Sequence, residues 1–295
     1  MMLSRTLSYS LLLAVCLIAA CQPVPNAQLL PSLTPIPQEI STPEAKELFL
    51  TEFPTDEPLS TPEPSEEPTL LTPSETAADE IINNLSEEVL ITVGDLDMAG
   101  TFYFPQDYSA PWPGVILIHM LYGDRSQWET FPDQLTEAGF AVLSIDLRGH
   151  GATGGSVNWD LAITDLQQVW SMFAARQDID QDRTAIIGAS IGANLALISS
   201  SNEASIRTAV LLSPGLNYAG VETGEAMKSY SDRPVLIVAS QEDAYAANSS
   251  TTLEDNALGV SQLIMYQNAG HGTFMFRSEP ELSQVITDWL DLYLE

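Results

Sequence analysis

Apolar and polar residues alternate in blocks from about residue 88 to the C-terminus. Short apolar runs predict strands, and a run almost without polar positions indicates a strand buried on both faces of a parallel sheet. These runs span 114–120, 140–146, 183–190, 206–213, 234–240 and 261–268. The stretches between and after them predict helices over 126–139, 159–177, 192–201 and 281–294. The alternation predicts an α/β protein in which helices cover both faces of a mostly parallel sheet.

The start of this region has two further signals. Residues 89–105 predict a hairpin of two strands ahead of the first buried strand. The helix over 126–139 is expected to begin at Ser126, whose hydroxyl can cap its first turn, and to stop at Gly139. We therefore expect an antiparallel entry into the parallel sheet.

The N-terminus has the pattern of an export signal. A single basic residue, Arg5, precedes an apolar run over residues 11–20, and Cys21 follows. The run is too short to cross a bilayer, so residues 1–20 are interpreted as a signal peptide. The stretch IAAC at 18–21 resembles the lipobox of bacterial lipoproteins, which implies a lipid on Cys21 that anchors the chain to the cell envelope. Plain secretion after cleavage behind Ala20 is the alternative.

Proline, threonine, serine and glutamate dominate the segment from residue 22 to about residue 80. Proline recurs too often there for a helix or a central strand. We interpret 21–80 as a lipidated N-terminus with a disordered acidic linker, and 81–295 as the folded domain. The formal net charge of −30, with only ten Lys and Arg residues, argues against a nucleic-acid partner.

Cysteine usage narrows the chemistry of the domain. The two cysteines, Cys16 and Cys21, both precede it, so it has no thiolate nucleophile, disulfide or cysteine metal site. No phosphate loop or dinucleotide fingerprint occurs, and three scattered histidines do not make a metal site. The sequence predicts neither a cofactor nor a metal.

A serine between two glycines follows one predicted strand. Gly188 and Gly192 flank Ser190 two residues away on each side, and a predicted helix follows directly. This G-x-S-x-G arrangement between strand and helix is the nucleophile elbow, in which the glycines allow a sharp turn and close approach of neighbouring backbone. Ser190 is the predicted nucleophile, and the backbone N–H of Ile191 is one predicted donor to an oxyanion.

A serine nucleophile needs a base and an orienting acid, in the chain order serine, acid, histidine. His271 is the one histidine downstream of Ser190 and is the predicted base. Asp243 follows a predicted buried strand and is the preferred acid, with Glu242 as the alternative. Asp232 is a distant third because it precedes that strand.

Two further motifs resemble those of the α/β-hydrolase superfamily. HMLYG at 119–123 is similar to the H-G-x-x-G loop, although Met120 replaces the usual glycine, and DLRGHG at 146–151 is similar to a D-x-R-G-H-G turn. From about residue 90 onward the chain resembles bacterial dienelactone hydrolases and small esterases. By position the resemblance assigns the second oxyanion donor to the N–H of Leu121. It implies structural roles for His119, Arg148 and His150.

The resemblance implies a serine hydrolase. Dienelactone hydrolases use a cysteine nucleophile, and Ser190 stands at that position, which favours ordinary ester hydrolysis. The stretch 214–232 is short for a lid, so we expect an open pocket for small or short-acyl esters. Candidate pocket residues are Met120, Tyr122, Trp159, Tyr218, Tyr245 and Phe274. The same residues would serve a thioesterase, amidase or peptidase, and a surface-tethered binding protein with little turnover is the alternative outside the enzymes.

Overall fold

The computed structural model describes residues 86–295. The predicted signal peptide (1–20), Cys21 and the linker to residue 80 lie outside the described residues. Eight strands form one sheet in the order β1-β2-β4-β3-β5-β6-β9-β10. Their bounds are β1 Ser86–Val93, β2 Leu96–Tyr103, β3 Trp112–Ile118, β4 Ala141–Ile145, β5 Ile179–Ala189, β6 Ile206–Leu212, β9 Val235–Ser240 and β10 Ser261–Tyr266.

The direction of the strands confirms the predicted sheet. β1 and β2 pair antiparallel as a hairpin, and β2 pairs antiparallel with β4. From β4 to β10 every neighbouring pair is parallel. The carboxyl ends of these parallel strands therefore share one edge of the sheet, which is where open α/β sheets bind their ligands.

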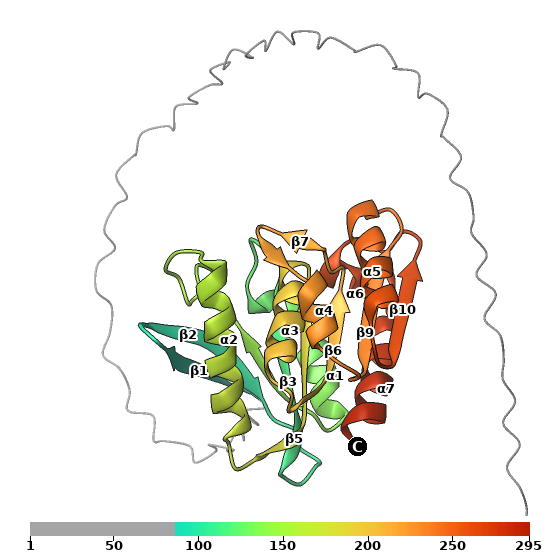
Figure 1. Cartoon of the computed structure of the whole chain (residues 1–295). Coiled ribbons are helices and arrows are strands. Elements are labelled where there is room, and N and C mark those ends of the chain that lie inside the picture. The colour runs from blue at the N-terminus through green and yellow to red at the C-terminus, as the bar shows by residue number, and fades with distance from the viewer. Residues whose placement is uncertain (1–85) are drawn as a thin grey trace, which may run out of the picture. The chain divides into compact units, whose positions relative to one another are not determined.

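Helices cover both faces of the sheet (Figure 1). They are η1 Arg125–Trp128, α1 Phe131–Glu137, α2 Trp159–Ala174, α3 Ile191–Asn202, α4 Gly224–Ser229, α5 Ala244–Asn256, η2 Gly272–Phe274, α6 Met275–Ser278 and α7 Leu282–Leu294. Side chains of α2, α3, α4 and α5 belong to one buried cluster, and those of α1 and α7 belong to the other. No helix within residues 86–295 is long and apolar enough to span a membrane.

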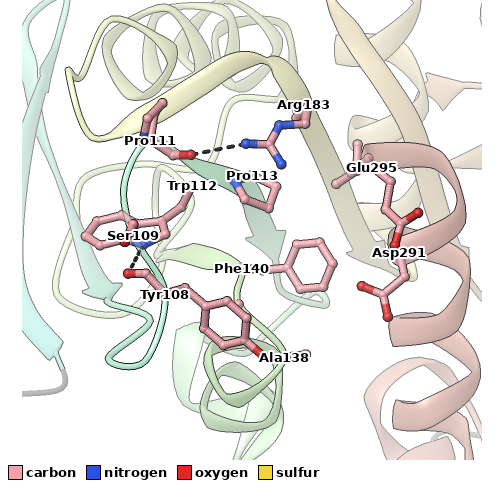
Figure 2. Close-up of a pocket in the computed structure, with 12 residues that line it drawn as sticks. Tyr108, Ser109, Pro111, Trp112, Pro113, Ala138, Phe140, Arg183, Asp291 and Glu295 are labelled. Carbon is pink, nitrogen blue, oxygen red and sulfur yellow. Dashed lines mark hydrogen bonds between the residues drawn. The ribbon is translucent and has the colours of Figure 1, made fainter.

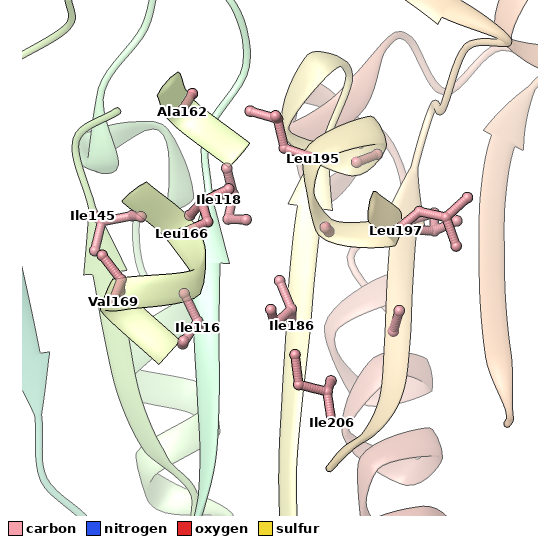
Figure 3. Packing of buried hydrophobic residues seen from close by; sticks show 14 of the residues in the cluster. Ile116, Ile118, Ile145, Ala162, Leu166, Val169, Ile186, Leu195, Leu197 and Ile206 are labelled. Carbon is pink, nitrogen blue, oxygen red and sulfur yellow. The ribbon is translucent and has the colours of Figure 1, made fainter. Parts of the chain in front are cut away.

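Successive side chains of a strand point to opposite faces of the sheet, so each buried strand contributes to both hydrophobic clusters. Ile116 and Ile118 of β3 belong to the cluster under α2 and α3, whereas Val115 and Leu117 belong to the cluster under α1 and α7. Figure 3 shows side chains of α2, such as Leu166, facing Ile116 and Ile118. All four strand side chains are at most 1% exposed. The continuous apolar run of β3 is thus explained by burial on both faces.

The predicted helix over 126–139 is wrong in one respect, because it is broken into η1 and α1. The backbone turns at Glu129, which has a φ of 49°. The cap of η1 is Asp124, whose carboxylate accepts the N–H of Ser126 at 2.8 Å, so Ser126 is not the cap. Gly139 does end α1, with a φ of 98° that favours glycine.

Two parts of the fold have no counterpart in the sequence prediction. The stretch after β6 forms a small hairpin, β7 (Asn217–Tyr218) with β8 (Val221–Glu222), followed by α4. α5 connects β9 to β10 but has only a weak apolar face, with four buried positions among thirteen residues. Weak amphipathicity is a poor signal in sequence, which explains why α5 escaped prediction.

Candidate active site

Ser190 lies at the sharp turn between β5 and α3. Its φ of 56° is a left-handed conformation that is uncommon for a residue with a side chain. A Cβ on Gly188 would stand 2.0 Å from the carbonyl oxygen of Gly192, and a Cβ on Gly192 would stand 2.4 Å from that of Ile118. Both glycines are therefore required by close backbone approach, as the elbow motif predicts.

His271 and Asp243 meet at the same edge of the sheet. Nδ1 of His271 is hydrogen-bonded to Oδ2 of Asp243, which precedes α5. Glu242 does not contact the imidazole: it accepts hydrogen bonds from the Ser240 hydroxyl and from the N–H of Gly270 at 2.6 Å. Asp232 precedes β9 and so lies at the opposite edge of the sheet. Of the three carboxylates considered from sequence, Asp243 is the one hydrogen-bonded to His271.

The loop that carries His271 packs against the turn that carries Ser190. A Cβ on Gly272 would stand 3.4 Å from the Cβ of Ala189 and 2.3 Å from the sulfur of Met120. The N–H of Gly272 donates to the hydroxyl of Ser213, which follows β6, at 2.9 Å. These contacts place the loop of His271, which is hydrogen-bonded to Asp243, against the turn of Ser190, which lies 81 positions earlier in the sequence.

The sequence predicts two backbone N–H groups, those of Leu121 and Ile191, as donors to an oxyanion. Ile191 is the first residue of α3, so its N–H has no acceptor within the helix and lies at the positive end of the helix dipole. On the facing loop the N–H of Met120 is already taken, because it donates to Oε1 of Gln127 at 3.0 Å. Leu121 is the next residue along this loop. The assignment of Leu121 and Ile191 as oxyanion donors stays a prediction.

Gln127 is a residue that sequence reasoning missed. Its side chain fills the space beside Gly123, where an added Cβ would come within 2.0–2.2 Å of the amide group. It thereby fixes the loop of Met120 and Leu121 from inside. A glutamine in a short 3-10 helix carries no sequence signal for this role.

The other two histidines have structural contacts, in line with the roles inferred for them. Nε2 of His119 accepts the N–H of Leu147 at 2.9 Å, so Nδ1 carries the hydrogen and donates to the carbonyl of Met120 at 2.7 Å. Burial is the main cause that lowers the pKa of His119, to about 4. The ring of His150 packs edge-on against that of His119, with ring centroids 5.1 Å apart, and Arg148 makes a bidentate buried pair with Asp165.

The six candidate pocket residues divide between three places. Tyr218 packs edge-on against His271, with ring centroids 6.3 Å apart, and also contacts Tyr245; Met120 is buried under Gly272. Burial and the charge of Asp243 raise the pKa of Tyr218. Phe274 follows the histidine loop and is half-exposed.

Two of those pocket candidates lie elsewhere. Tyr122 is 92% exposed, so it projects into solvent. Trp159 stacks on His150 and lines a cavity of about 530 Å³ between α2, α3 and the β7–β8 hairpin. Met120, Tyr218, Tyr245 and Phe274 are thus the candidates with contacts at the predicted triad, directly or through a neighbour.

A further pocket, of about 230 Å³, lies at the amino-terminal edge of the strands (Figure 2). Trp112 at the start of β3 and Phe140 just before β4 line it, together with Asp291 and Glu295 at the end of the chain. Arg183 closes one side by donating to the carbonyl of Pro111 at 3.1 Å. Because Ser190 lies at the carboxyl edge, this pocket is not part of the predicted active site.

A mostly parallel sheet with helices on both faces, and with a serine at a strained turn on its carboxyl edge, defines the α/β-hydrolase fold, and the chain has this fold. Residues 111–229 match a family model described as "Serine aminopeptidase, S33", and residues 214–292 match one described as "TAP-like protein".

The chain is similar in sequence to part of one bacterial protein, and its fold is similar to those of solved hydrolases. An uncharacterized protein of Mycobacterium tuberculosis is 28% identical over 110 residues, which is 37% of this chain and 39% of that protein. The match thus spans well under half of the relative. The dienelactone hydrolase of Anabaena variabilis superposes with a TM-score of 0.59 at 19% identity, over 72% of this chain and 100% of that one. The acetyl xylan esterase of Paenibacillus sp. R4 superposes with a TM-score of 0.60 at 14% identity, over 71% of this chain and 89% of that one.

Proposed function

We propose that the protein is a serine hydrolase that cleaves small or short-acyl carboxylic esters through an acyl-enzyme. The observation that carries this proposal is the Asp243–His271 pair beside the strained turn of Ser190. The esterases among the structural neighbours support an ester as the substrate. No cofactor or metal takes part in the proposed reaction.

Each residue has a defined part in the proposed reaction. His271 removes the proton from the Ser190 hydroxyl as its oxygen attacks the ester carbonyl, and Asp243 holds the imidazole and stabilises its charged form. The N–H groups of Leu121 and Ile191 bind the oxyanion of the tetrahedral intermediate. His271 then protonates the departing alcohol, and water activated by His271 releases the acid and restores Ser190.

The proposal is tested with p-nitrophenyl esters from acetate to decanoate. The full-length chain is assayed beside Ser190→Ala and His271→Ala, and release of p-nitrophenol is measured. We expect turnover that is highest on the short esters and falls to background in both variants, because removal of a triad member typically costs a factor of 10⁴ or more. A folded parent without turnover, or activity retained by Ser190→Ala, would overturn the triad and favour a binding protein.

An aminopeptidase is the second candidate, because residues 111–229 match the serine aminopeptidase model. Ser190, His271 and Asp243 would serve amide cleavage in the same roles. Aminoacyl p-nitroanilides assayed beside the esters separate the two candidates. A kcat/KM on an anilide above that on p-nitrophenyl acetate would replace the esterase proposal.

We also propose that the protein is exported and held at the cell envelope by lipid on Cys21, with small-molecule esters as its substrates. The support is the sequence IAAC at 18–21 behind an apolar run. Several acyl chains on one cysteine suffice for stable anchoring. Labelled palmitate should be incorporated into the parent and not into Cys21→Ser. Equal labelling of both would contradict the anchor.

A further inference from the structure

The loop that carries His271 has almost no regular structure of its own. It follows β10 and leads into η2, and its supports come from other strands. The N–H of Ala269 donates to the Ser240 hydroxyl at 2.8 Å, that of Gly270 donates to Glu242, and that of Gly272 donates to Ser213. Side chains from the ends of β6 and β9 thus hold the backbone on both sides of His271.

Glu242 lies at the centre of this arrangement although its side chain is exposed. One carboxylate oxygen accepts from Gly270 at 2.6 Å, and the other accepts from the Ser240 hydroxyl, whose oxygen in turn accepts from Ala269. A glutamate carboxylate is ionised at neutral pH, and the Ser240 hydroxyl lowers the pKa of Glu242 further. Hydrogen bonds to an ionised acceptor are shorter and stronger than those between neutral groups.

The neighbouring carboxylate has a different partner. Asp243 binds the ring of His271, whereas Glu242 binds the backbone that precedes the ring. Asp243 thus holds the side chain of His271, and the adjacent Glu242 holds the backbone of its loop. Glu242 is exposed and forms no ion pair within residues 86–295. One of its carboxylate oxygens binds the His271 loop directly, and the other binds it through the Ser240 hydroxyl, so Glu242 has no evident part in stabilising the core.

We propose that Glu242 is a positioning residue for the hydrolytic reaction: through Ser240 and Gly270 it fixes the loop of His271, while Asp243 orients the imidazole. The inference rests on the hydrolytic function proposed above. A misplacement of a catalytic group by about 1 Å can cost on the order of a hundredfold in rate. The effect of losing Glu242 should therefore appear in kcat, with KM close to that of the parent.

The test compares Glu242→Ala, Glu242→Gln and Asp243→Asn in the full-length chain, with p-nitrophenyl acetate as substrate. Glu225→Ala is the matched control, because Glu225 is an exposed carboxylate in α4 whose partner is Lys228. We expect Glu242→Ala to lower kcat roughly ten- to hundredfold. Glu242→Gln should recover most of this loss, since its amide oxygen still accepts from Gly270. Asp243→Asn should lose about 10⁴-fold, because the imidazole tautomer is wrong.

The pattern among the variants distinguishes positioning from charge. A purely electrostatic effect on His271 would shift the acid limb of the kcat/KM profile equally in the alanine and glutamine variants, without recovery of kcat. That result overturns the proposal, as does Glu242→Ala at the parent's kcat. A loss in Glu242→Ala as large as that in Asp243→Asn would instead make Glu242 the acid of the triad.

A second measurement does not depend on turnover. Hydrogen exchange of the peptide that contains residues 269–272 is followed in the parent, in Glu242→Ala and in Glu225→Ala. We expect faster exchange in Glu242→Ala alone, because the Gly270 N–H loses its acceptor. Unchanged exchange overturns the proposed contact. A parent that protects this peptide but hydrolyses no ester would refute the hydrolytic function, and with it the catalytic role of Glu242, while retaining the contact.

Discussion

Two loops at the carboxyl edge of the sheet carry the predicted catalytic residues, and they are held in different ways. The turn around Ser190 is fixed by backbone packing: Gly188 faces the carbonyl of Gly192, and Gly192 faces those of Ile118 and His119. The loop around His271 is fixed by the side chains of Ser213, Ser240 and Glu242. The turn of Ser190 depends on two positions without side chains, whereas the loop of His271 depends on three side chains that lie far away in sequence.

The difference has a physical reason. A nucleophile at a strand-to-helix turn must be exposed while its backbone stays in a strained conformation, and dense backbone contacts supply the constraint. A histidine loop at the end of a parallel strand has unpaired N–H groups, which need acceptors when buried. The turn of Ser190 should therefore respond to added volume, and the loop of His271 to lost acceptors.

Among the substitutions that test this comparison of the two loops, Gly188→Ala should have the largest effect. The new Cβ would lie 2.0 Å from the oxygen and 2.3 Å from the carbon of the Gly192 carbonyl, and backbone cannot yield as a flexible side chain does. We expect ester hydrolysis to fall at least a hundredfold, since a 1 Å shift of Ser190 alone can cost that much. The measurement is kcat on p-nitrophenyl acetate together with the thermal midpoint of unfolding.

Gly224→Ala is the control for this prediction, because an added Cβ there meets no atom within 4 Å. It should retain the activity and stability of the parent. Equal activity in Gly188→Ala and Gly224→Ala would show that the turn of Ser190 tolerates volume, and the comparison between the two loops would fail.

This asymmetry explains which part of the site the sequence predicts. Gly188, Ser190 and Gly192 are near neighbours, so the elbow is visible as a local motif, and the structure shows the steric reason for both glycines. The apolar runs predict the strands for a similar reason, because burial on both faces leaves few polar positions. Features that depend on neighbouring residues, such as the turn of Ser190 and the buried strands, can therefore be predicted from short stretches of sequence.

Contacts between distant segments are not visible in this way. Ser213 and Gln127 look like ordinary polar residues until the fold places them beside Gly272 and Met120. The adjacent pair Glu242 and Asp243 is also ambiguous in sequence, and the hydrogen bonds distinguish them only in three dimensions. α5 and the β7–β8 hairpin were missed because short or weakly amphipathic elements are stabilised by tertiary contacts.

The next effect concerns His119, whose carbonyl lies against Gly192 and whose ring is buried. Burial, with a smaller contribution from His150, lowers its pKa to about 4, against the opposing effects of the Met120 carbonyl and of Asp146 and Asp124. The unfolded chain binds the proton near its usual pKa of about 6.5, so the folded state loses stability as pH falls from about 6.5 to 4. The expected contribution is about 3 kcal/mol.

The free energy of unfolding in urea is measured at pH 7 and at pH 4 for the parent and for His119→Gln, whose side chain does not titrate. The parent should lose about 3 kcal/mol more than the variant over this interval, after both are compared with their own stability at pH 7. The same loss in both proteins would show that carboxylates alone account for the acid sensitivity. Protonation of His119 would then make no measurable contribution to the pH dependence of stability.

Ser213→Ala, which removes a hydrogen-bond acceptor from the loop of His271, should have the smallest effect. The Ser213 hydroxyl is fully buried and is the acceptor for the buried N–H of Gly272, so the substitution leaves that N–H without its partner. An unsatisfied buried donor costs about 1–3 kcal/mol, and kcat should fall with it because the donor is adjacent to His271. Ser205→Ala, at an exposed serine, is the matched control for stability and for kcat. If Ser213→Ala unfolded in urea at the same midpoint as Ser205→Ala with kcat unchanged, side-chain acceptors would not be what holds this loop, and backbone packing would be the shared support of both.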